Sequence, residues 1–261
     1  MDDGYGLGIT LDFMGIPKRN KENVKAGFFK KAIQKKIGRA IADYHMLKDG
    51  DKILVAVSGG KDSLILLKLL LERRVFVPIK YDVIACYVDL GHKTANVAVL
   101  KKYLEQQACS YHIVRKKVFK KTSDAKLTCF WCSWNRRKAL FALAQKYGCN
   151  KIALGHHKDD IITTILMNLL FEGQISAMVP SQEIFKGGIT LIRPLAYVEE
   201  EELQRFAQIY DIPSADVACP IGKQTKRALV RSFVEEVKVA CPSVKTNIFK
   251  SIQRIKKDYL L

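Results

Sequence analysis

The sequence predicts an α/β protein built on a doubly wound, parallel sheet of five strands. Short apolar runs alternate along the chain with longer segments whose apolar residues recur at helical spacing. Strands that alternate with helices pair in parallel and carry helices on both faces of the sheet. The chain has 261 residues and is 48% hydrophobic, which suits one such domain with extensions.

The expected elements divide the chain into three parts. Predicted strands cover residues 52–57, 82–88, 111–115, 151–155 and 189–193. Predicted helices of the same domain cover about 62–74, 95–107, 131–147, 159–171 and 199–210. Before them, residues 22–47 form an amphipathic helix with a basic face, and further helices are expected at 224–239 and 243–259. The parts are therefore an N-terminal arm and basic helix (1–47), the α/β domain (48–212) and a C-terminal helical extension (213–261).

A glycine-rich loop joins the first predicted strand to the first helix of the domain. Such a turn presents backbone N–H groups and the positive end of a helix dipole to an anion. Two glycines let the backbone approach a phosphate closely, and a lysine adds positive charge. The loop is too short for a Walker motif, and an ordinary turn with a polar N-cap is the alternative. The phosphate-binding residues expected here are Ser58, Gly59, Gly60, Lys61, Asp62 and Ser63.

Other polar residues follow the ends of predicted strands, where ligands bind in doubly wound sheets. Asp159 and Asp160 fall in the first turn of a helix, where one carboxylate could cap the helix and one could hold Mg²⁺. His156 fits a nucleotide contact and a packed core histidine equally well. The further nucleotide-binding candidates are Val88, Asp89, Gly155 and His156.

Three of the seven cysteines are candidate metal ligands. Cys129 and Cys132 lie one helical turn apart, which suits two thiolates on one metal centre, and Cys219 would add a third. The N-terminal residues do not resemble a signal peptide, so reduced thiols fit better than disulfides. Zinc, a redox dithiol and an iron–sulfur cluster all remain open on spacing alone. The other thiols, expected in the core or incidental, are Cys86, Cys109, Cys149 and Cys241.

The charge predicts a polyanionic partner. The chain has 44 Lys and Arg against 26 Asp and Glu, a formal net charge of +18. RNA, DNA and an anionic membrane surface remain possible on charge alone, and no apolar run is long enough for a transmembrane helix. Trp131 and Trp134 lie among basic residues and could stack on a splayed base, although core packing suits Trp131 better. Candidate phosphate contacts, each of which could instead be solvated, are Arg136, Arg137, Lys223, Lys226, Arg227 and Arg231.

In combination these motifs resemble the tRNA 2-thiocytidine synthetase family of PP-loop ATP pyrophosphatases, from about residue 28 to residue 240. The resemblance rests on five segments: residues 40–44, the loop 58–63, Cys129 to Cys132 with Arg136 and Arg137, residues 152–160 and residues 192–195. It implies that ATP adenylates the C2 oxygen of an anticodon-loop cytidine and releases pyrophosphate. A sulfide carried on a three-cysteine [4Fe–4S] cluster then replaces AMP.

The resemblance also assigns roles to residues. Cys129, Cys132 and Cys219 would hold the cluster. The loop would bind the ATP phosphates, and the catalytic residues would be Lys61, Asp62, Asp159 and Asp160, with Asp160 the strongest candidate for Mg²⁺ or proton handling. The family further implies a cytoplasmic enzyme, a sulfur donor such as a cysteine desulfurase, no membrane partner, and a possible homodimer.

Several alternatives stay open at this point. The surroundings of Cys219 are more like those of the related tRNA 2-thiouridine synthetases, although the terminal zinc-binding cysteine pairs of those enzymes do not occur here. A tRNA lysidine synthetase would need no cysteine triad. A non-catalytic RNA-binding protein would not need the intact Lys61 and Asp62, and a zinc-stabilised nucleotidyl transferase is a further possibility. The thiolated base is left undecided.

Overall fold

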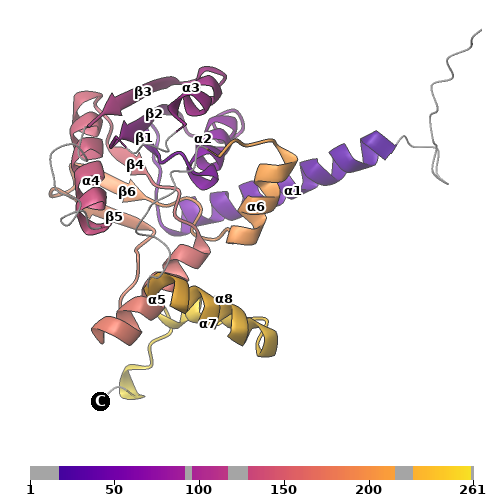
Figure 1. Cartoon of the computed structure of the whole chain (residues 1–261), viewed down its shortest axis with the longest axis vertical. Coiled ribbons are helices and arrows are strands. Elements are labelled where there is room, and N and C mark those ends of the chain that lie inside the picture. Colours follow the sequence, from indigo (N-terminus) through magenta and orange to yellow (C-terminus); the bar gives the residue numbers. More distant parts are fainter. Residues whose placement is uncertain (1–17, 92–95, 117–128, 215–225, 260–261) are drawn as a thin grey trace, which may run out of the picture.

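The computed structural model describes residues 18–91, 96–116, 129–214 and 226–259 and has the expected α/β fold (Figure 1). The strands are β1 (Asp51–Val57), β2 (Tyr81–Asp89), β3 (Ser110–Arg115), β4 (Lys151–Ala153), β5 (Ser181–Ile184) and β6 (Ile189–Ile192). The helices are α1 (Lys18–Asp43), α2 (Lys61–Arg73), α3 (Val97–Glu105), α4 (Cys129–Lys146), α5 (Lys158–Glu172), α6 (Glu200–Ile209), α7 (Lys226–Ala240) and α8 (Val244–Ser251), followed by the 3₁₀ turn η2 (Lys257–Tyr259).

The strand order of the sheet, β3-β2-β1-β4-β6-β5, reverses direction at β1. β1 pairs in parallel with β2 on one side and with β4 on the other, where Val55 lies opposite Ala153. In a doubly wound sheet such a reversal leaves a crevice beyond the carboxyl ends of the two central strands. The loops that follow β1 and β4 therefore meet at the place where a ligand is expected.

The prediction of five strands is wrong, because the sheet has a sixth. β5 pairs antiparallel with β6 at the edge of the sheet. Its sequence, Ser181 to Ile184, is mostly polar and only partly buried, so it lacks the apolar run that marks the central strands. The turn that leads into β6 contains Phe185 and Lys186, each with a φ of 54°, and Gly187 at 86°, which is unusual for the first two residues.

Two apolar cores cover the two faces of the sheet. On one face, β1 and β2 pack against α1, α2, α3 and α6, with Leu64 and Phe206 fully buried. On the other, Leu54 and Ile84 pack against α4 through Leu140. α2 is buried along almost its whole length, which agrees with its nearly continuous apolar sequence.

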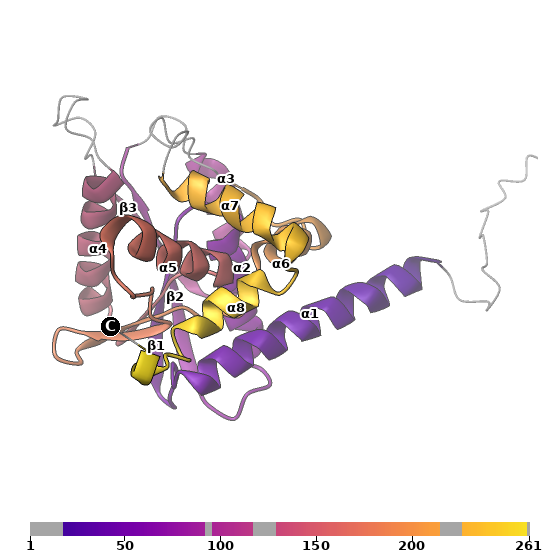
Figure 2. The same cartoon turned by 90° about the horizontal axis from the view of Figure 1, so that it is seen from below.

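A smaller bundle stands beyond the carboxyl edge of the sheet. α5 leaves that edge and packs against α7 and α8, as both views of the chain show (Figure 1, Figure 2). Ile162 and Leu166 of α5 share a core with Val230, Val234 and Val244. The helix expected over 243–259 is interrupted, since α8 ends at Ser251. No helix among the described residues is long and apolar enough to cross a membrane.

Candidate active site at the carboxyl edge of the sheet

The loop after β1 leaves the first turn of α2 open to a ligand, although the N–H of Gly60 already donates to the hydroxyl of Ser58 (3.3 Å). Gly59 has a φ of 95°, which favours glycine, and Gly60 is the N-cap of α2 with no side-chain hydrogen bond to the helix. The hydroxyl of Ser63 donates to the carbonyl of Gly60 (2.8 Å) and accepts from the N–H of Ser58 (3.1 Å). The hydroxyl of Ser63 thus ties Ser58 to Gly60, while the first turn of α2 has no side-chain cap. That is the arrangement of an anion site.

Gly155 brings the loop after β4 against this anion site. A Cβ atom on Gly155 would lie 3.0 Å from both the Cα and the N of Ser63, and 3.2 Å from the carbonyl carbon of Asp62. Those neighbours are backbone atoms of the first turn of α2 and cannot easily move. A side chain here would force these backbone segments apart by a few tenths of an ångström, so the glycine allows the starts of α2 and α5 to lie together.

Asp62 is the carboxylate of the loop with an unused oxygen. Its Oδ1 is buried and accepts no hydrogen bond, and the nearest cation, the ammonium of Lys61, lies 3.9 Å away. Burial raises the pKa of Asp62, and the charges of Lys61 and His157 oppose that rise. A buried carboxylate oxygen without a partner beside a phosphate loop fits a magnesium ion.

Asp159, in contrast, is fully engaged within the protein. Its Oδ1 lies 2.7 Å from the ammonium of Lys245, and its Oδ2 accepts from the N–H of Glu200 (2.8 Å). His157 Nδ1 lies 3.6 Å from the same Oδ2, which is ion-pair distance but too long for a hydrogen bond. Burial alone would raise the pKa of Asp159, but its contacts with His157 and Lys245 hold it well below the usual range.

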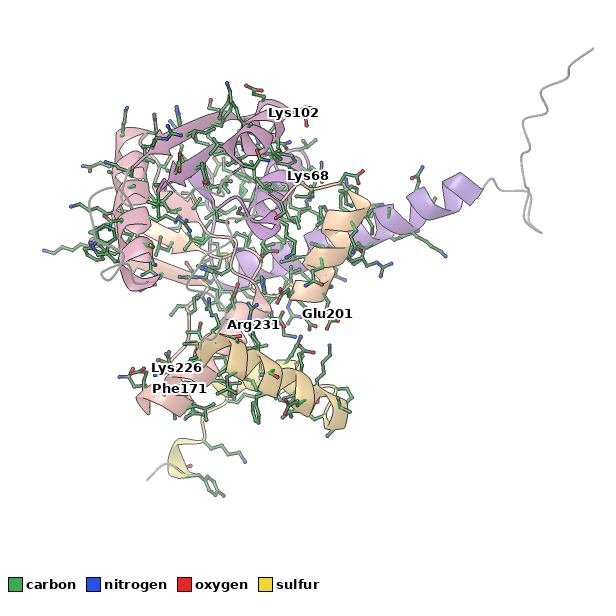
Figure 3. The ribbon with its side chains drawn as sticks, in the orientation of Figure 1. Lys68, Lys102, Phe171, Glu201, Lys226 and Arg231 are labelled. Carbon is green, nitrogen blue, oxygen red and sulfur yellow. The ribbon has the colours of Figure 1, made fainter. Side chains whose placement is uncertain are left out.

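Asp160 links α5 to α7. Its Oδ1 accepts from Nη2 of Arg231 (3.1 Å), and its Oδ2 accepts from the N–H of His157 (3.3 Å) at the start of α5. The other terminal nitrogen of Arg231 lies 3.5 Å from Glu200, so this arginine holds three helices together. Figure 3 shows Arg231 on α7, with Glu201 of α6 on the neighbouring element.

Three buried polar atoms without hydrogen-bond partners belong to these acid and base residues. Within the described residues they are Asp62 Oδ1, His157 Nδ1 and Arg231 Nε. Buried polar groups are rarely left unpaired, so each needs an explanation. Burial lowers the pKa of His157, but Asp159, Asp160 and Asp62 outweigh it and raise the pKa. The unpaired oxygen of Asp62 could bind a cation, and the unpaired nitrogens of His157 and Arg231 could donate to phosphates. Together the three atoms suit a ligand that carries both anionic phosphates and a cation.

His156 is a neutral acceptor in this site. Its Nδ1 accepts from Nε of Arg193 (3.4 Å), and Arg193 also donates to the carbonyl of Val179. Burial, reinforced by the charge of Arg193, lowers the pKa of His156 to about 4. Burial and the neighbouring Arg137 lower the pKa of Arg193 to about 10. Arg193, Lys245 and His157 were missed as site residues, although Arg193 directly follows β6, the kind of position that singled out Ser58 and Asp89.

The side chain at the carboxyl end of β2 is hydrogen-bonded within the protein and has no oxygen left without a partner. Asp89 is 4% exposed; its Oδ1 accepts from the N–H of Gly91 (2.8 Å) and its Oδ2 from Nε of Arg115 (3.0 Å). The side chain of Val88 is buried in the core shared with α4. These two residues fix the backbone at the edge of the site.

The structure describes part of the cysteine set. Cys129 opens α4, and Cys132, one turn later, is half-buried against the core beneath that helix. Cys219 and Lys223 lie outside the described residues, within which no group of three metal-ligating side chains occurs. Cys86 and Cys149 are buried, and burial raises the pKa of Cys86 to about 12, as expected of a core thiol.

The candidate RNA contacts fall into two groups. Arg136 and Arg137 lie on α4, one turn after Cys132. Lys226 and Arg227 begin α7, and Lys226 lies 4.8 Å from the ring centroid of Phe171 at the far end of α5 (Figure 3). A hollow of about 820 Å³ lies elsewhere, between α1 and the last turn of α2, and the polar atoms described above do not line it.

Fold and site together define a PP-loop nucleotide-binding protein. The PP-loop domain family matches residues 29–238, most of the chain. The chain is 37% identical over 237 residues to a tRNA-cytidine(32) 2-sulfurtransferase of Geobacter sulfurreducens, covering 88% of this chain and 92% of that one. It is 32% identical over 274 residues to that of Burkholderia cenocepacia, covering 100% and 83%. The chain belongs to this family, as the resemblance of its motifs predicted.

A solved structure has the same fold. It is the U34-tRNA thiolase NcsA from Methanococcus maripaludis with its [4Fe-4S] cluster. The TM-score is 0.74 at 23% sequence identity, over 95% of this chain and 87% of that one. At this identity the likeness shows the architecture alone.

Proposed function

We propose that this chain is an ATP-dependent tRNA-cytidine 2-sulfurtransferase, which replaces the C2 oxygen of an anticodon-loop cytidine with sulfur. The names of its relatives supply the reaction and the substrate class. The observation that carries the proposal in this chain is the close approach of Gly155 to Ser63. This approach supports the proposal because it brings the residues just before α5, which carries Asp160, to the phosphate loop, which carries Asp62.

In the first step the C2 oxygen of the base attacks the α-phosphate of ATP, and pyrophosphate leaves. The N–H groups of the loop and the ammonium of Lys61 offset the charge on the phosphates. Asp62, through its unpaired oxygen, and Asp160 would hold Mg²⁺ on the phosphate oxygens. His156, kept neutral by burial and by Arg193, would donate its Nε2–H to the nucleotide, because its Nδ1 accepts from Arg193.

In the second step sulfide attacks C2 and AMP leaves with the former oxygen. Cys129, Cys132 and Cys219 would hold a [4Fe–4S] cluster, the group that the thiolase of the same fold contains. When bound, the cluster would supply the sulfide for this step, and the three cysteines would hold it. Cys129 and Cys132 open α4, where the helix dipole stabilises thiolates, and the half-buried position of Cys132 leaves it near the surface.

The remaining proposals concern organisation and partners. Residues 48–212 would form the nucleotide-binding domain, 1–47 a basic arm and helix, and 213–261 an extension that carries the third cysteine. Arg136, Arg137, Lys223, Lys226 and Arg227 would contact tRNA phosphates, in keeping with the net charge of +18. The sulfur would come from a donor such as a cysteine desulfurase, in the cytoplasm, and the enzyme could act as a homodimer.

The test is mass spectrometry of nucleosides in tRNA from cells that lack the protein. Loss of 2-thiocytidine, restored by the wild-type gene, is the expected result. Loss of 2-thiouridine or of lysidine instead would assign the chain to one of those reactions, and unchanged tRNA would contradict catalysis. Complementation by Lys61→Met should fail. Lys68→Met, on the same helix and equally exposed (29% against 30% for the side chain), should complement (Figure 3).

A further inference from the structure

One face of α4, beside the cysteine pair, carries an exposed tryptophan between cations. Trp134 is 58% exposed, and Arg137 and Lys138, three and four residues further on, are exposed as well. Residues at this spacing lie together on one helix face. The opposite face is fixed in the core by Leu140 and Leu143, so the orientation of the helix is determined. The exposed face is therefore a defined surface, which we call the Trp134 face: Trp134, Arg137 and Lys138.

Within the part of the chain that the structure describes, the cations of this surface form no ion pair. α4 contains no Asp or Glu, so no carboxylate lies on the same helix to pair with them. Among the ion pairs formed by the described residues, none involves Arg137 or Lys138. An aromatic ring flanked by unpaired cations is complementary to a polyanion that carries flat, unpaired rings, and an apolar protein surface would offer no partner for the charges.

The helix that carries this surface begins beside the active site. Cys132, near its start, packs against the core that contains Val88 and Leu90 at the carboxyl end of β2, and β2 pairs with β1, which the phosphate loop follows. A nucleic acid bound along the Trp134 face would therefore extend toward the carboxyl edge of the sheet, where the base must react.

The structure separates the two tryptophans of the chain. Trp131 is half-buried in the first turn of α4, and its carbonyl accepts from Nδ2 of Asn135 (2.9 Å). Trp134 instead stands in solvent on the side of Arg137. With more than half of its surface in solvent, Trp134 leaves a large aromatic surface open to contact with a ligand.

We propose that Trp134 is a stacking platform for an unpaired nucleobase of the tRNA, held in place by phosphate contacts of Arg137 and Lys138. This inference rests on the proposed function and adds to it a residue that recognises the unpaired part of the substrate. Any base can stack on an indole, so the platform contributes affinity and position rather than sequence selectivity. Single-stranded loops, whose bases can be splayed out, are the RNA elements that such a platform binds.

The test is anaerobic binding of the holoenzyme to a fluorescein-labelled, unmodified tRNA anticodon stem-loop, measured by anisotropy. Trp134→Ala should weaken binding about tenfold, as expected for the loss of one stacked base. Trp134→Phe should retain most of the affinity, whereas Trp134→Leu should behave like Trp134→Ala. Phe76→Ala is the matched control, because Phe76, in the turn after α2, is equally exposed (59%) and should bind as wild type.

A second measurement distinguishes stacking from charge. The slope of the logarithm of the binding constant against the logarithm of the salt concentration should fall by about one phosphate contact in Arg137→Gln. The same slope should stay unchanged in Trp134→Ala. In the variant Trp131→Phe, Trp134 is the remaining indole, and the stem-loop should quench its fluorescence when the apoprotein is titrated. If the fluorescence of Trp134 does not change on titration, the indole does not contact the base.

The outcomes separate this inference from the proposed function. If the wild type binds and thiolates tRNA but Trp134→Ala binds equally well, the platform is refuted and the function stands. If the wild type binds no tRNA, both fall. If Trp134→Ala keeps its tRNA affinity but changes the sedimentation of the enzyme or its response to a cysteine desulfurase, the Trp134 face is a protein interface, and the proposal is overturned.

Discussion

The ammonium of Lys245 on α8 lies 2.7 Å from Oδ1 of Asp159 on α5, with both side chains almost completely buried. The same ammonium lies 2.8 Å from Glu235 on α7. Asp159 is thus held by the protein itself, and its neighbour Asp160 is held by Arg231 and His157, whereas among the described residues Asp62 of the loop keeps an oxygen without a partner. Lys245 acts by fixing the start of α5.

Lys245→Met should lower the free energy of unfolding by roughly 3 kcal/mol, because it leaves the carboxylate of Asp159 buried without its partner. Urea denaturation at neutral pH measures the change. Lys238→Met is the control, since Lys238 belongs to the same network but is a third exposed, and its loss should cost less than about 1 kcal/mol. Equal losses in the two variants would show that burial does not set the strength of the Lys245 pair.

Gly155→Ala should raise the KM for ATP and lower thiolation at least tenfold, because the new Cβ meets the backbone of Ser63 at 3.0 Å. Steady-state kinetics of the purified enzyme measure both effects. Gly27→Ala provides the comparison: nothing lies within 4 Å of its Cβ position, and it should leave activity unchanged while stabilising α1 slightly. An unaltered KM in Gly155→Ala would contradict the close contact.

His156 should make the protein acid-sensitive. Because its pKa falls from 6.5 to about 4 on folding, the unfolded chain binds more protons between these pH values. Stability is therefore lost as the pH falls through this window, by up to about 3 kcal/mol. Urea denaturation at pH 7 and pH 4.5 should show a larger loss for the wild type than for His156→Gln. Parallel losses in both proteins would assign the acid sensitivity to other groups.

Cys132→Ala and Cys219→Ala should each abolish the visible absorption of anaerobically purified protein, because a cluster needs all three thiolates. Binding of ATP should persist in both, since the phosphate loop is separate from the thiols. Cys241→Ala should stay coloured, as Cys241 is only a surface thiol at the junction of α7 and α8. Colourless wild-type protein that carries stoichiometric zinc would exclude the cluster.

The parts of the fold that could be predicted are those that a local sequence pattern indicates. Central parallel strands are buried on both faces and are therefore continuous apolar runs, and the loop 58–63 carries its glycines in a recognisable order. β5 could not be found in this way, because an edge strand such as Ser181 to Ile184 needs no apolar run. The end of α8 at Ser251 was likewise not predicted; this helix packs against α5, which lies far away in sequence.

The partners of charged residues could not be predicted. Periodicity places Lys245 and Arg231 on helices but does not show which carboxylates they meet, since those lie far away in sequence. Arg231 was expected to contact RNA on charge alone, and the structure shows its guanidinium held by Asp160 and Glu200. Adjacent aspartates also look equivalent in sequence, whereas the fold gives Asp159 a lysine and Asp160 an arginine.

α5 contributes to two apolar clusters at once, with Ile162 facing α7 and α8, and Ile161 and Ile165 packed beside Ala196. Wherever a domain boundary is drawn, the C-terminal helices are not a detachable module. A truncation before α7 would strip the cover from α5 and expose these isoleucines to water. Chimeric enzymes made to exchange substrate preference between relatives should therefore take α5, α7 and α8 from the same parent protein.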